Sequence, residues 1–438
     1  MTMLHPGLRD SWAEYEKTVG AEAAEDVERF KAAIYRERFP HLFPPPLFDG
    51  AFVAELTADA QSLLRLLYSL PDRIFDGNVA AWMEFQGLPG DERDLLSSLL
   101  SERNLLVARQ FARPDFLLTA EGPRLVEVNV SAPLGGLNTH DPYVRQFRRS
   151  GYHDHLLRAG FPVSAPDMTS VWGAALRQFA RVRPETGRPV LYEAIANPED
   201  INSGRTAFEQ LVGENGYDYA NGLVQSLDVT DAGVFLDGRR IHAIFTMYTW
   251  KEAREFVPPA LTRALADADA AGLVDFVAPP TYALFDHKSN LELLSSPEFA
   301  GFFSEPERRL IRRYVPETFR LTAANAERVV GEKDRLVLKP ASEYGGRGIL
   351  FGDQMSPGEW AGAVRAAVAS GEGHVCQERL AELWRYPGPD GREYHVVLGP
   401  LVFAGEYGGT LVRWTDVESR NLLINVRNGA EAGALLSA

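Results

Sequence analysis

Residues 113–137, RPDFLLTAEGPRLVEVNVSAPLGGL, place Asp115, Glu127 and Asn129 in otherwise apolar stretches. Oxygen ligands of this kind suit Mg²⁺ that also holds phosphates. Residues two apart on a strand share a face, so Glu127 and Asn129 point the same way, and a turn at 120–122 can bring Asp115 beside them. Converging carboxylates repel each other unless a cation lies between them. The alternative interpretation is a solvated sheet face on which polar and apolar residues alternate.

A second set of candidate residues lies between 336 and 348. The apolar run at 336–338 ends in Lys339 and is followed by the glycine-rich segment 342–348, SEYGGRG. Backbone N–H groups of such a loop can approach a phosphate, while the lysine adds a point charge. The spacing is not that of the P-loop, GxxxxGK[ST], and Gly-Gly pairs most often serve turns. The segment alone therefore leaves phosphate binding and a simple turn both open.

Two shorter stretches could complete a nucleotide site. Lys288, in the segment FDHKSN, stands at the start of a predicted helix, where a cation is unfavourable unless an anion also binds. A surface lysine is the alternative. The segment VCQERL, residues 375–380, predicts a short strand whose exposed backbone could hydrogen-bond an adenine edge. Neither stretch is diagnostic by itself.

Hydrophobic periodicity predicts the elements that position these residues. Helical spacing dominates residues 1–105, and two β-type runs within 106–130, joined by the turn at 120–122, predict an antiparallel hairpin. Helical and strand patterns alternate in residues 165–280, with a strand pattern over 239–250, and predict a separate small α/β unit. A strand, a loop, a helix and a strand follow it, and residues 393–426 again alternate like strands.

In combination these features resemble the ATP-grasp superfamily. Its metal hairpin typically reads R-x-D, a turn, E-[VI]-N and a Pro-Gly loop. The chain has RPD at 113–115, EVN at 127–129 and PLGG at 133–136 in that order, with one extra residue before the glycines. In the common arrangement the small α/β domain comes first and the hairpin last, whereas here the hairpin comes first. The chain therefore resembles the circularly permuted group that contains glutathione synthetases and glutathionylspermidine synthetases, a permutation that termini close in space make tolerable.

The resemblance implies a role for each candidate residue. The implied Mg²⁺ ligands are Asp115, Glu127 and Asn129, and the implied phosphate contacts are Lys288 and Lys339. Gly345, Gly346 and Gly348 would form a lid loop, and Gln377, Glu378 and Leu380 would border the adenine. Arg113 matches an arginine that neutralises charge on the transferring phosphoryl group, and Arg413 lies where permuted relatives carry a further phosphate-facing residue. Both arginines are catalytic candidates, and the roles of Glu193, Arg205, Tyr248, Trp250 and Arg427 stay open.

The fold that the resemblance implies is α/β: a circularly permuted ATP-grasp core, whose two α/β subdomains grip ATP, together with a smaller α/β domain. Residues 1–160 would hold a helical lead-in and the metal hairpin, and residues 161–285 the small substrate domain. Residues 286–385 would hold the two lysines, the lid and the adenine hinge. Residues 386–438 would return strands to the core.

Length and composition limit the class of protein. A chain of 438 residues favours two or three domains, and 45% hydrophobic with 24% charged residues is typical of a soluble globular protein. The net charge of −15 argues against nucleic acid as a partner. The single cysteine excludes an intramolecular disulfide. The first residues lack the apolar core of a signal peptide and no run has membrane-spanning length, so a cytoplasmic protein without a membrane partner is expected.

The activity that the resemblance implies is an ADP-forming carboxylate-amine ligase. ATP, with two Mg²⁺ ions, would phosphorylate a carboxylate, and an amine would attack the acyl phosphate to form an amide. Amino-acid or small-peptide substrates are expected from the family alone, and a homodimer is left open. Two alternatives stand beside it: an ATP-grasp kinase that stops at phosphoryl transfer, and a scaffold protein that binds ATP without turnover.

Overall fold

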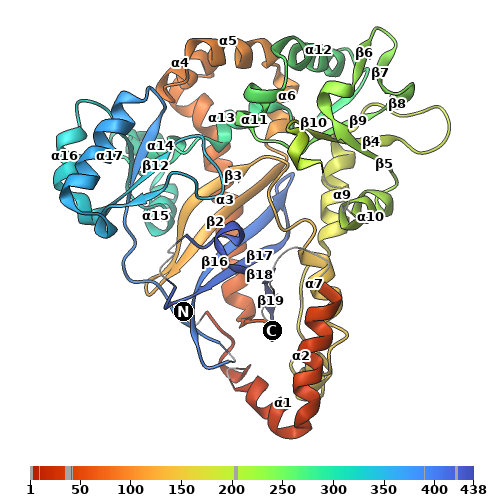
Figure 1. Cartoon of the computed structure of the whole chain (residues 1–438), viewed down its shortest axis with the longest axis vertical. Helices are drawn as coiled ribbons and strands as arrows, with labels where there is room; N and C mark the ends of the chain where they lie inside the picture. The colour runs from red at the N-terminus through yellow and green to blue at the C-terminus, as the bar shows by residue number, and fades with distance from the viewer. Residues whose placement is uncertain are drawn as a thin grey trace.

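The computed structural model describes residues 3–8, 10–34, 41, 43–201, 206–388, 390–419 and 423–438, and within them the chain forms a mixed α/β structure with five sheets (Figure 1). A six-stranded antiparallel sheet holds β2 (Phe111–Thr119), β3 (Gly122–Val130), β15 (Tyr386–Pro387), β16 (Glu393–Phe403), β17 (Glu406–Asp416) and β18 (Glu431–Ala434). Strand β2 pairs with β16, so the hairpin from the first third of the chain joins strands from its last fifth. Both ends of the described chain lie against β1 (Leu47–Phe48), which pairs with β19 (Leu436–Ser437) and forms a bridge with Leu4.

The predicted hairpin is confirmed, with one irregularity. Strands β2 and β3 pair antiparallel, with Asp115 opposite Glu127 and Arg113 opposite Asn129. The register then shifts, because the next pair is Phe116 with Leu125 and Val126 is left as an extra residue. Such a β-bulge bends the strand and re-aims its side chains. It lets both Val126 and Glu127 line the same cleft.

The opposite face of this sheet packs on the long helix α3 (Gly50–Phe75). The α3 side chains Leu56, Leu63 and Leu67 recur at helical spacing and are buried in one cluster with sheet residues such as Phe116 and Leu398. The Asp49 side chain caps the helix by accepting from the Ala51 and Phe52 N–H groups. One face of the sheet is thus committed to the apolar core, and the other carries the charged residues.

A four-stranded antiparallel sheet carries Lys339 and the predicted adenine hinge. Its order is β11 (Thr318–Arg320), β14 (His374–Glu378), β12 (Leu336–Pro340) and β13 (Leu350–Phe351). Helices α16 (Ala326–Gly331) and α17 (Pro357–Ala369) cover one face through a cluster that includes Trp360 and the free thiol of Cys376. Before it in the chain lie α13 (Ala283–Asp286), α14 (Asn290–Ser295) and α15 (Glu305–Tyr314).

A parallel sheet forms within residues 165–280, where the sequence predicts an α/β unit. Its order is β10 (Asp275–Val277), β9 (Ala243–Thr246), β4 (Val190–Ile195) and β5 (Asp218–Leu223). Helices α9 (Met168–Gln178) and α10 (Thr206–Glu214) pack on one face, and α12 (Pro259–Ala270) belongs to the core on the other. The small antiparallel sheet β6 (Asp228–Thr230), β7 (Gly233–Leu236) and β8 (Arg239–Ile241) adjoins it.

The remaining helices are α1 (Ser11–Val19), α2 (Ala21–Ile34), α7 (His140–Phe147) and α8 (Gly151–Arg158), which share one small core, and α4 (Val79–Phe85), α5 (Gly90–Leu99), α6 (Glu102–Ala108) and α11 (Trp250–Phe256). Helices α1 and α2 form the lower arm in Figure 1. No helix in the described part of the chain combines the length and the apolarity that a membrane span requires.

Three local predictions are wrong. Residues 106–108 belong to helix α6 and not to the β-type run, because the Ser101 side chain accepts from the Asn104 N–H and caps a helix there. The strand predicted to run through Trp250 ends at Thr246, and Trp250 begins helix α11 instead. The strand pattern predicted up to residue 426 ends at Asp416 in β17, and residues 417–419 and 423–426 are not in strands, while residues 420–422 lie outside the described part of the chain.

Candidate functional site

The main cleft lies between the six-stranded sheet and the four-stranded antiparallel sheet, and it encloses about 840 Å³, part of it open to solvent. Its charged and polar lining comprises Asp115, Glu127, Lys339, Gln377, Glu378, Arg379, Asn425 and Arg413, and its apolar lining Leu117, Val126, Val337, Ile349, Phe351, Leu380, Leu383, Val397, Leu423 and Ile424. Apolar walls with a few convergent charged groups suit a ligand that has a flat ring and an anionic tail.

Asp115 is held by two guanidinium groups that come from opposite ends of the chain. It accepts from Arg113 Nε at 2.9 Å and Nη2 at 3.1 Å, and Arg413 Nη2 lies 2.7 Å from its Oδ1. Burial alone would raise the pKa of Asp115, but the charges of Arg113 and Arg413 outweigh it and hold the pKa below its ordinary value. The carboxylate is therefore ionised and paired with two cations of the protein.

The hairpin brings the three predicted Mg²⁺ ligands onto one face, as the register requires. The Asn129 amide donates to Asp115 Oδ2 at 3.1 Å and to the Arg113 carbonyl, and Glu127 lies 3.8 Å from Lys288 Nζ. The described residues hold no cluster of three His, Cys, Asp or Glu side chains that could bind an ion. Glu127 and the Asn129 oxygen fit Mg²⁺ as hard donors. Asp115 fits only if the ion competes with its arginines.

Lys339 contacts a carbonyl that the bulge exposes. Its Nζ donates to Gln377 Oε1 at 2.6 Å and to the carbonyl of Val126, the extra residue of β3, at 3.1 Å. Burial lowers the pKa of Lys339 to about 8, with Glu127 acting against the shift and Lys288 adding to it. An ammonium group has three donors, and two are used here, so one remains for a ligand in the cleft.

Lys288 follows helix α13 and precedes α14, close to where the sequence predicts it. Its Nζ donates to the Glu343 carbonyl at 2.5 Å, and its backbone N–H donates to the Ala341 carbonyl at 3.1 Å. Both partners lie at the start of the glycine-rich loop. Lys288 is buried and therefore is not the surface lysine of the alternative interpretation.

The charges around the main cleft favour an anion. Five cationic groups, on Arg113, Arg379, Arg413, Lys288 and Lys339, and three carboxylates, on Asp115, Glu127 and Glu378, line or border the cleft. These eight groups carry an excess of two positive charges in a chain whose net charge is −15. The buried Nε donor of Arg413 also has no hydrogen-bond partner among the described residues. Buried donors are nearly always paired, so an anionic ligand in the cleft would complete it.

The glycine-rich loop borders the same cleft. Gly345, Gly346 and Gly348 have φ values of +67°, +78° and +69°, a region that favours glycine. The backbone of the loop therefore requires glycine at these three positions. A Cβ at Gly345 would lie 3.5 Å from the Arg427 side chain, and one at Gly346 would lie 3.4 Å from Leu423. The loop therefore meets residues 423–428 near the cleft.

Gln377, Glu378 and Leu380 line the cleft, as the predicted adenine hinge requires. The Gln377 side chain is already committed, because it accepts from Lys339 and donates to Thr318 Oγ1 at 3.1 Å. The apolar walls were not predicted, although their spacing carries a signal. Leu117 lies two residues after Asp115, and Val337 two before Lys339, so each shares a strand face with a charged residue.

The five candidates of open role are scattered. Glu193 is fully buried in β4 and accepts from the Tyr219 hydroxyl, and the Tyr248 carbonyl accepts from the Tyr282 hydroxyl at 2.7 Å. Trp250 donates from its indole to Glu92. Arg427 is exposed beside the glycine-rich loop, and Arg205 lies outside the described residues.

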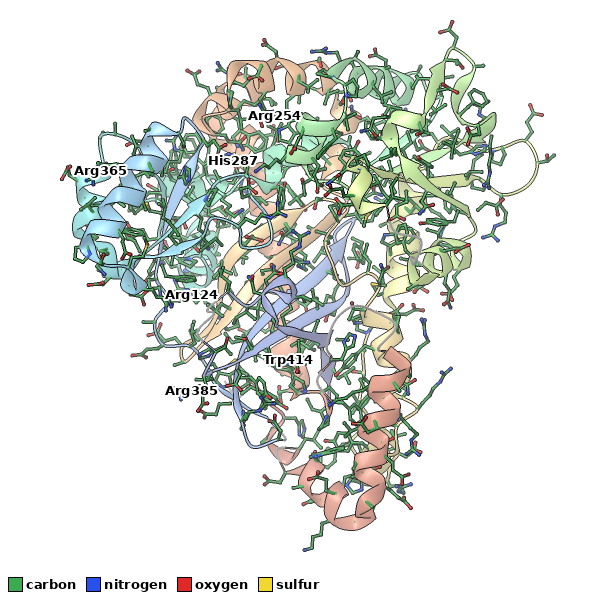
Figure 2. The ribbon with its side chains drawn as sticks, in the orientation of Figure 1. Arg124, Arg254, His287, Arg365, Arg385 and Trp414 are labelled. Atoms are coloured by element: carbon green, nitrogen blue, oxygen red, sulfur yellow. The ribbon has the colours of Figure 1, made fainter. Side chains whose placement is uncertain are left out.

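A narrow side cavity of about 320 Å³, part of it open to solvent, lies on the other side of Lys288, lined by Leu88, Glu92, Leu96, Trp250, Ala283, Asp286, His287, Lys288, Ser342 and Tyr344. His287 and Arg254, whose Nη1 contacts Glu92 at 2.7 Å, are both labelled in Figure 2. Burial raises the pKa of Asp286 to about 7, with Lys288 acting against the shift, and burial lowers the pKa of His287 to about 3. The imidazole is therefore neutral at neutral pH.

Comparisons with known proteins give only distant likenesses. No protein-family model and no curated protein matches the chain. A solved structure of a candidate gamma-glutamylcysteine synthetase from Methylobacillus flagellatus KT has a TM-score of 0.45 and 14% identity, covering 85% of this chain and 87% of that one. The ATP-grasp ligase PsnB, complexed with a minimal precursor, has a TM-score of 0.33 and 13% identity, covering 57% and 76%. Both likenesses are too distant to establish a fold family or an activity.

Proposed function

We propose that the chain is an ADP-forming, ATP-dependent carboxylate-amine ligase with a circularly permuted ATP-grasp fold. The observation that carries the proposal is the main cleft, where Asp115, Glu127, Lys339 and Arg413 line a space with apolar walls, Arg113 is paired with Asp115, and Lys288 lies beside Glu127. The cleft suits Mg·ATP, with the ring against the apolar residues and the phosphates among the cations. The ligase class rests on the resemblance of the sequence. The division of the chain into domains at residues 160, 285 and 385 belongs to the same proposal.

The residues would act on the phosphates as follows. Lys288 and Lys339 would bind phosphate oxygens, and Arg113 and Arg413 would balance the charge that develops on the transferring phosphoryl group. Glu127 and Asn129, with Asp115 once its arginines turn to the ligand, would hold Mg²⁺. The ion would supply charge neutralisation at the phosphates.

The reaction needs a site that closes. A substrate carboxylate oxygen attacks the γ-phosphorus and ADP leaves; the amine nitrogen then attacks the acyl carbon, phosphate leaves, and the nitrogen loses a proton to give the amide. Water would hydrolyse the acyl phosphate, so the glycine-rich loop and residues 423–428 would cover the cleft during turnover. We expect small-molecule acids and amines as substrates, amino acids or small peptides among them, and no nucleic-acid or membrane partner.

The test is ADP release from Mg·ATP with amino acids and small peptides supplied in pairs, followed by the mass of any product. The ligase predicts ADP release that requires both an acid and an amine, and a product mass equal to their sum less water. ADP release without an amine, with a stable phosphorylated product, would assign a kinase instead. Mg·ATP binding without ADP release from any pair would assign a scaffold protein.

Glu127→Ala tests the role of the cleft carboxylate in the proposed reaction. It removes the cleft carboxylate next to both lysines, and we expect ADP formation to fall about 10²- to 10³-fold, as for other groups that act on transition-state charge, while the fold persists. Glu121→Ala, in the exposed turn of the same hairpin, is the control and should keep wild-type turnover. Near-normal turnover of Glu127→Ala would remove the metal and phosphate assignment.

A further inference from the structure

Tyr344 is the residue of the glycine-rich loop that points inward, toward Lys288. Its hydroxyl hydrogen-bonds the Asp286 carboxylate, and its ring centroid lies 5.8 Å from Lys288 Nζ, within the range of a cation–π contact. Burial and the nearby Asp286 raise the pKa of Tyr344 above its ordinary value, so the hydroxyl stays protonated and donates. The backbone just before Tyr344 is also tied to Lys288, through the carbonyls of Ala341 and Glu343.

Asp286 connects this loop to the metal hairpin. Its Oδ1 accepts from the N–H of Val130, the last residue of β3, at 3.2 Å. The same strand carries Glu127, whose carboxylate lies 3.8 Å from Lys288 Nζ. A closed path of contacts therefore runs from the loop through Tyr344 and Asp286 to β3, and back through Glu127 to Lys288.

Other contacts of the loop lack this connection. The Glu343 side chain forms an ion pair with Lys251 of α11, whose side chain is 55% exposed, so water screens that pair. The three glycines that follow Tyr344 let the backbone bend but offer no side chain. Tyr344 is thus the loop side chain that reaches Asp286 and Lys288 together, both of which are buried.

We propose that Tyr344 is a positioning residue that couples closure of the glycine-rich loop to placement of the Lys288 ammonium group at the main cleft. This inference rests on the proposed function, because it assumes that Lys288 binds a phosphate there. When the hydroxyl holds Asp286 and the ring lies against the ammonium, Lys288 is kept between the loop and Glu127. When the loop opens, Lys288 loses the Glu343 carbonyl and the Tyr344 ring at once.

The test separates the hydroxyl from the ring. Tyr344→Phe keeps the ring and removes the bond to Asp286, and we expect about tenfold weaker Mg·ATP binding, the size of a hydrogen bond to a charged group. Tyr344→Leu removes both contacts and should weaken binding further. Glu343→Gln is the control in the same loop, since it removes the exposed pair with Lys251 but keeps the carbonyl that Lys288 uses, and it should bind within about twofold of wild type.

A double-mutant cycle decides whether Tyr344 acts through Lys288. Each Tyr344 variant is combined with Lys288→Met, and Mg·ATP affinity is measured by calorimetry. We expect Tyr344→Phe to change affinity less than about twofold once Lys288 is absent, because the group that it positions is gone. A tenfold loss that persists in the Lys288→Met background would mean that Tyr344 only supports the fold, and would overturn the proposal.

Hydrogen exchange without nucleotide tests the contact independently of the proposed function. Tyr344→Phe should speed exchange of backbone N–H groups in residues 341–348 by about tenfold, and Glu343→Gln should not. Unchanged exchange in Tyr344→Phe would overturn the proposal whether or not the protein binds ATP. Faster exchange in a protein whose wild type has no affinity for Mg·ATP would refute the proposed function and confine Tyr344 to holding the loop.

Discussion

Raising the pH from 7 to 9 should weaken Mg·ATP binding by discharging one buried lysine. The pKa of Lys339 is about 8 in the ligand-free fold, because the side chain is buried with only the partial compensation of Glu127. Protonation of a group with that pKa falls from about 90% at pH 7 to about 10% at pH 9. If phosphate binding requires the ammonium form, the apparent affinity falls about tenfold over this range, or about 1.4 kcal/mol.

The assay is calorimetric titration of Mg·ATP at pH 7, 8 and 9, at fixed ionic strength and saturating Mg²⁺. Lys339→Met should bind weakly at every pH and lose the pH dependence. Lys251→Met, which changes an exposed lysine on α11, should keep the tenfold fall. A wild-type affinity that is flat between pH 7 and 9, or an equal fall in Lys339→Met, would refute the role given to Lys339.

The lowered pKa of Lys339 should raise the stability of the ligand-free protein over part of the pH range in which it weakens Mg·ATP binding. The folded pKa of Lys339 is below its ordinary value of 10.5, so between pH 8 and 10.5 the folded protein binds fewer protons than the unfolded chain. The free energy of unfolding without ligand should therefore rise across that window, by about 3 kcal/mol at most. The difference in the free energy of unfolding between wild type and Lys339→Met isolates this effect, since other groups titrate in both proteins. If that difference does not change with pH, burial does not lower the pKa of Lys339.

The remaining predictions concern two positions that shape the site. A Cβ at Gly399 would lie 2.8 Å from Asp115 Oδ1, so Gly399→Ala should lower ADP formation at least tenfold and the free energy of unfolding by about 1–3 kcal/mol. Gly362→Ala, in a helix where the Cβ meets nothing, should keep activity and stabilise by about 0.5–1 kcal/mol; equal losses in both variants would refute the steric argument. The Asn290 Oδ1 accepts from the indole of Trp82 at 3.0 Å and from a second buried donor. Asn290→Ala should therefore lower the free energy of unfolding, measured in urea, by about 3 kcal/mol. A change below about 1 kcal/mol would contradict this prediction.

The hairpin could be predicted because its two signals are local. Alternating apolar residues flank the turn at 120–122, and the period of two fixes which side chains share a face. The bulge at Val126 could not be predicted, because it depends on how β3 pairs with β2 and leaves the composition of the strand unchanged. It nevertheless supplies the carbonyl that Lys339 contacts.

The partners of Asp115 show a second limit of sequence reasoning. Arg113 lies two residues away on the same strand face, so its contact follows from local geometry. Arg413 reaches Asp115 only because β17 pairs with β16 and β16 pairs with β2. The sequence predicts three oxygen ligands around a cation, whereas in the structure two arginines already balance one of them. The roles assigned to Asp115, Glu127 and Asn129 at Mg²⁺ stay predictions.

Asp115 also links completion of the sheet to formation of the site. Without Arg413, Asp115 would keep only one of the two guanidinium groups that offset its burial, and the loss of one partner from a buried charge network is strongly destabilising. Arg413 therefore helps to make burial of Asp115 tolerable, but it lies on a strand near the far end of the chain. Asp115 consequently gains its second guanidinium partner only after the C-terminal strands have docked on the hairpin. A nucleotide phosphate would compete for the same arginines. The two guanidinium groups would therefore serve both the pairing of Asp115 in the folded sheet and the binding of the ligand, so folding and the proposed function depend on the same residues in this cleft.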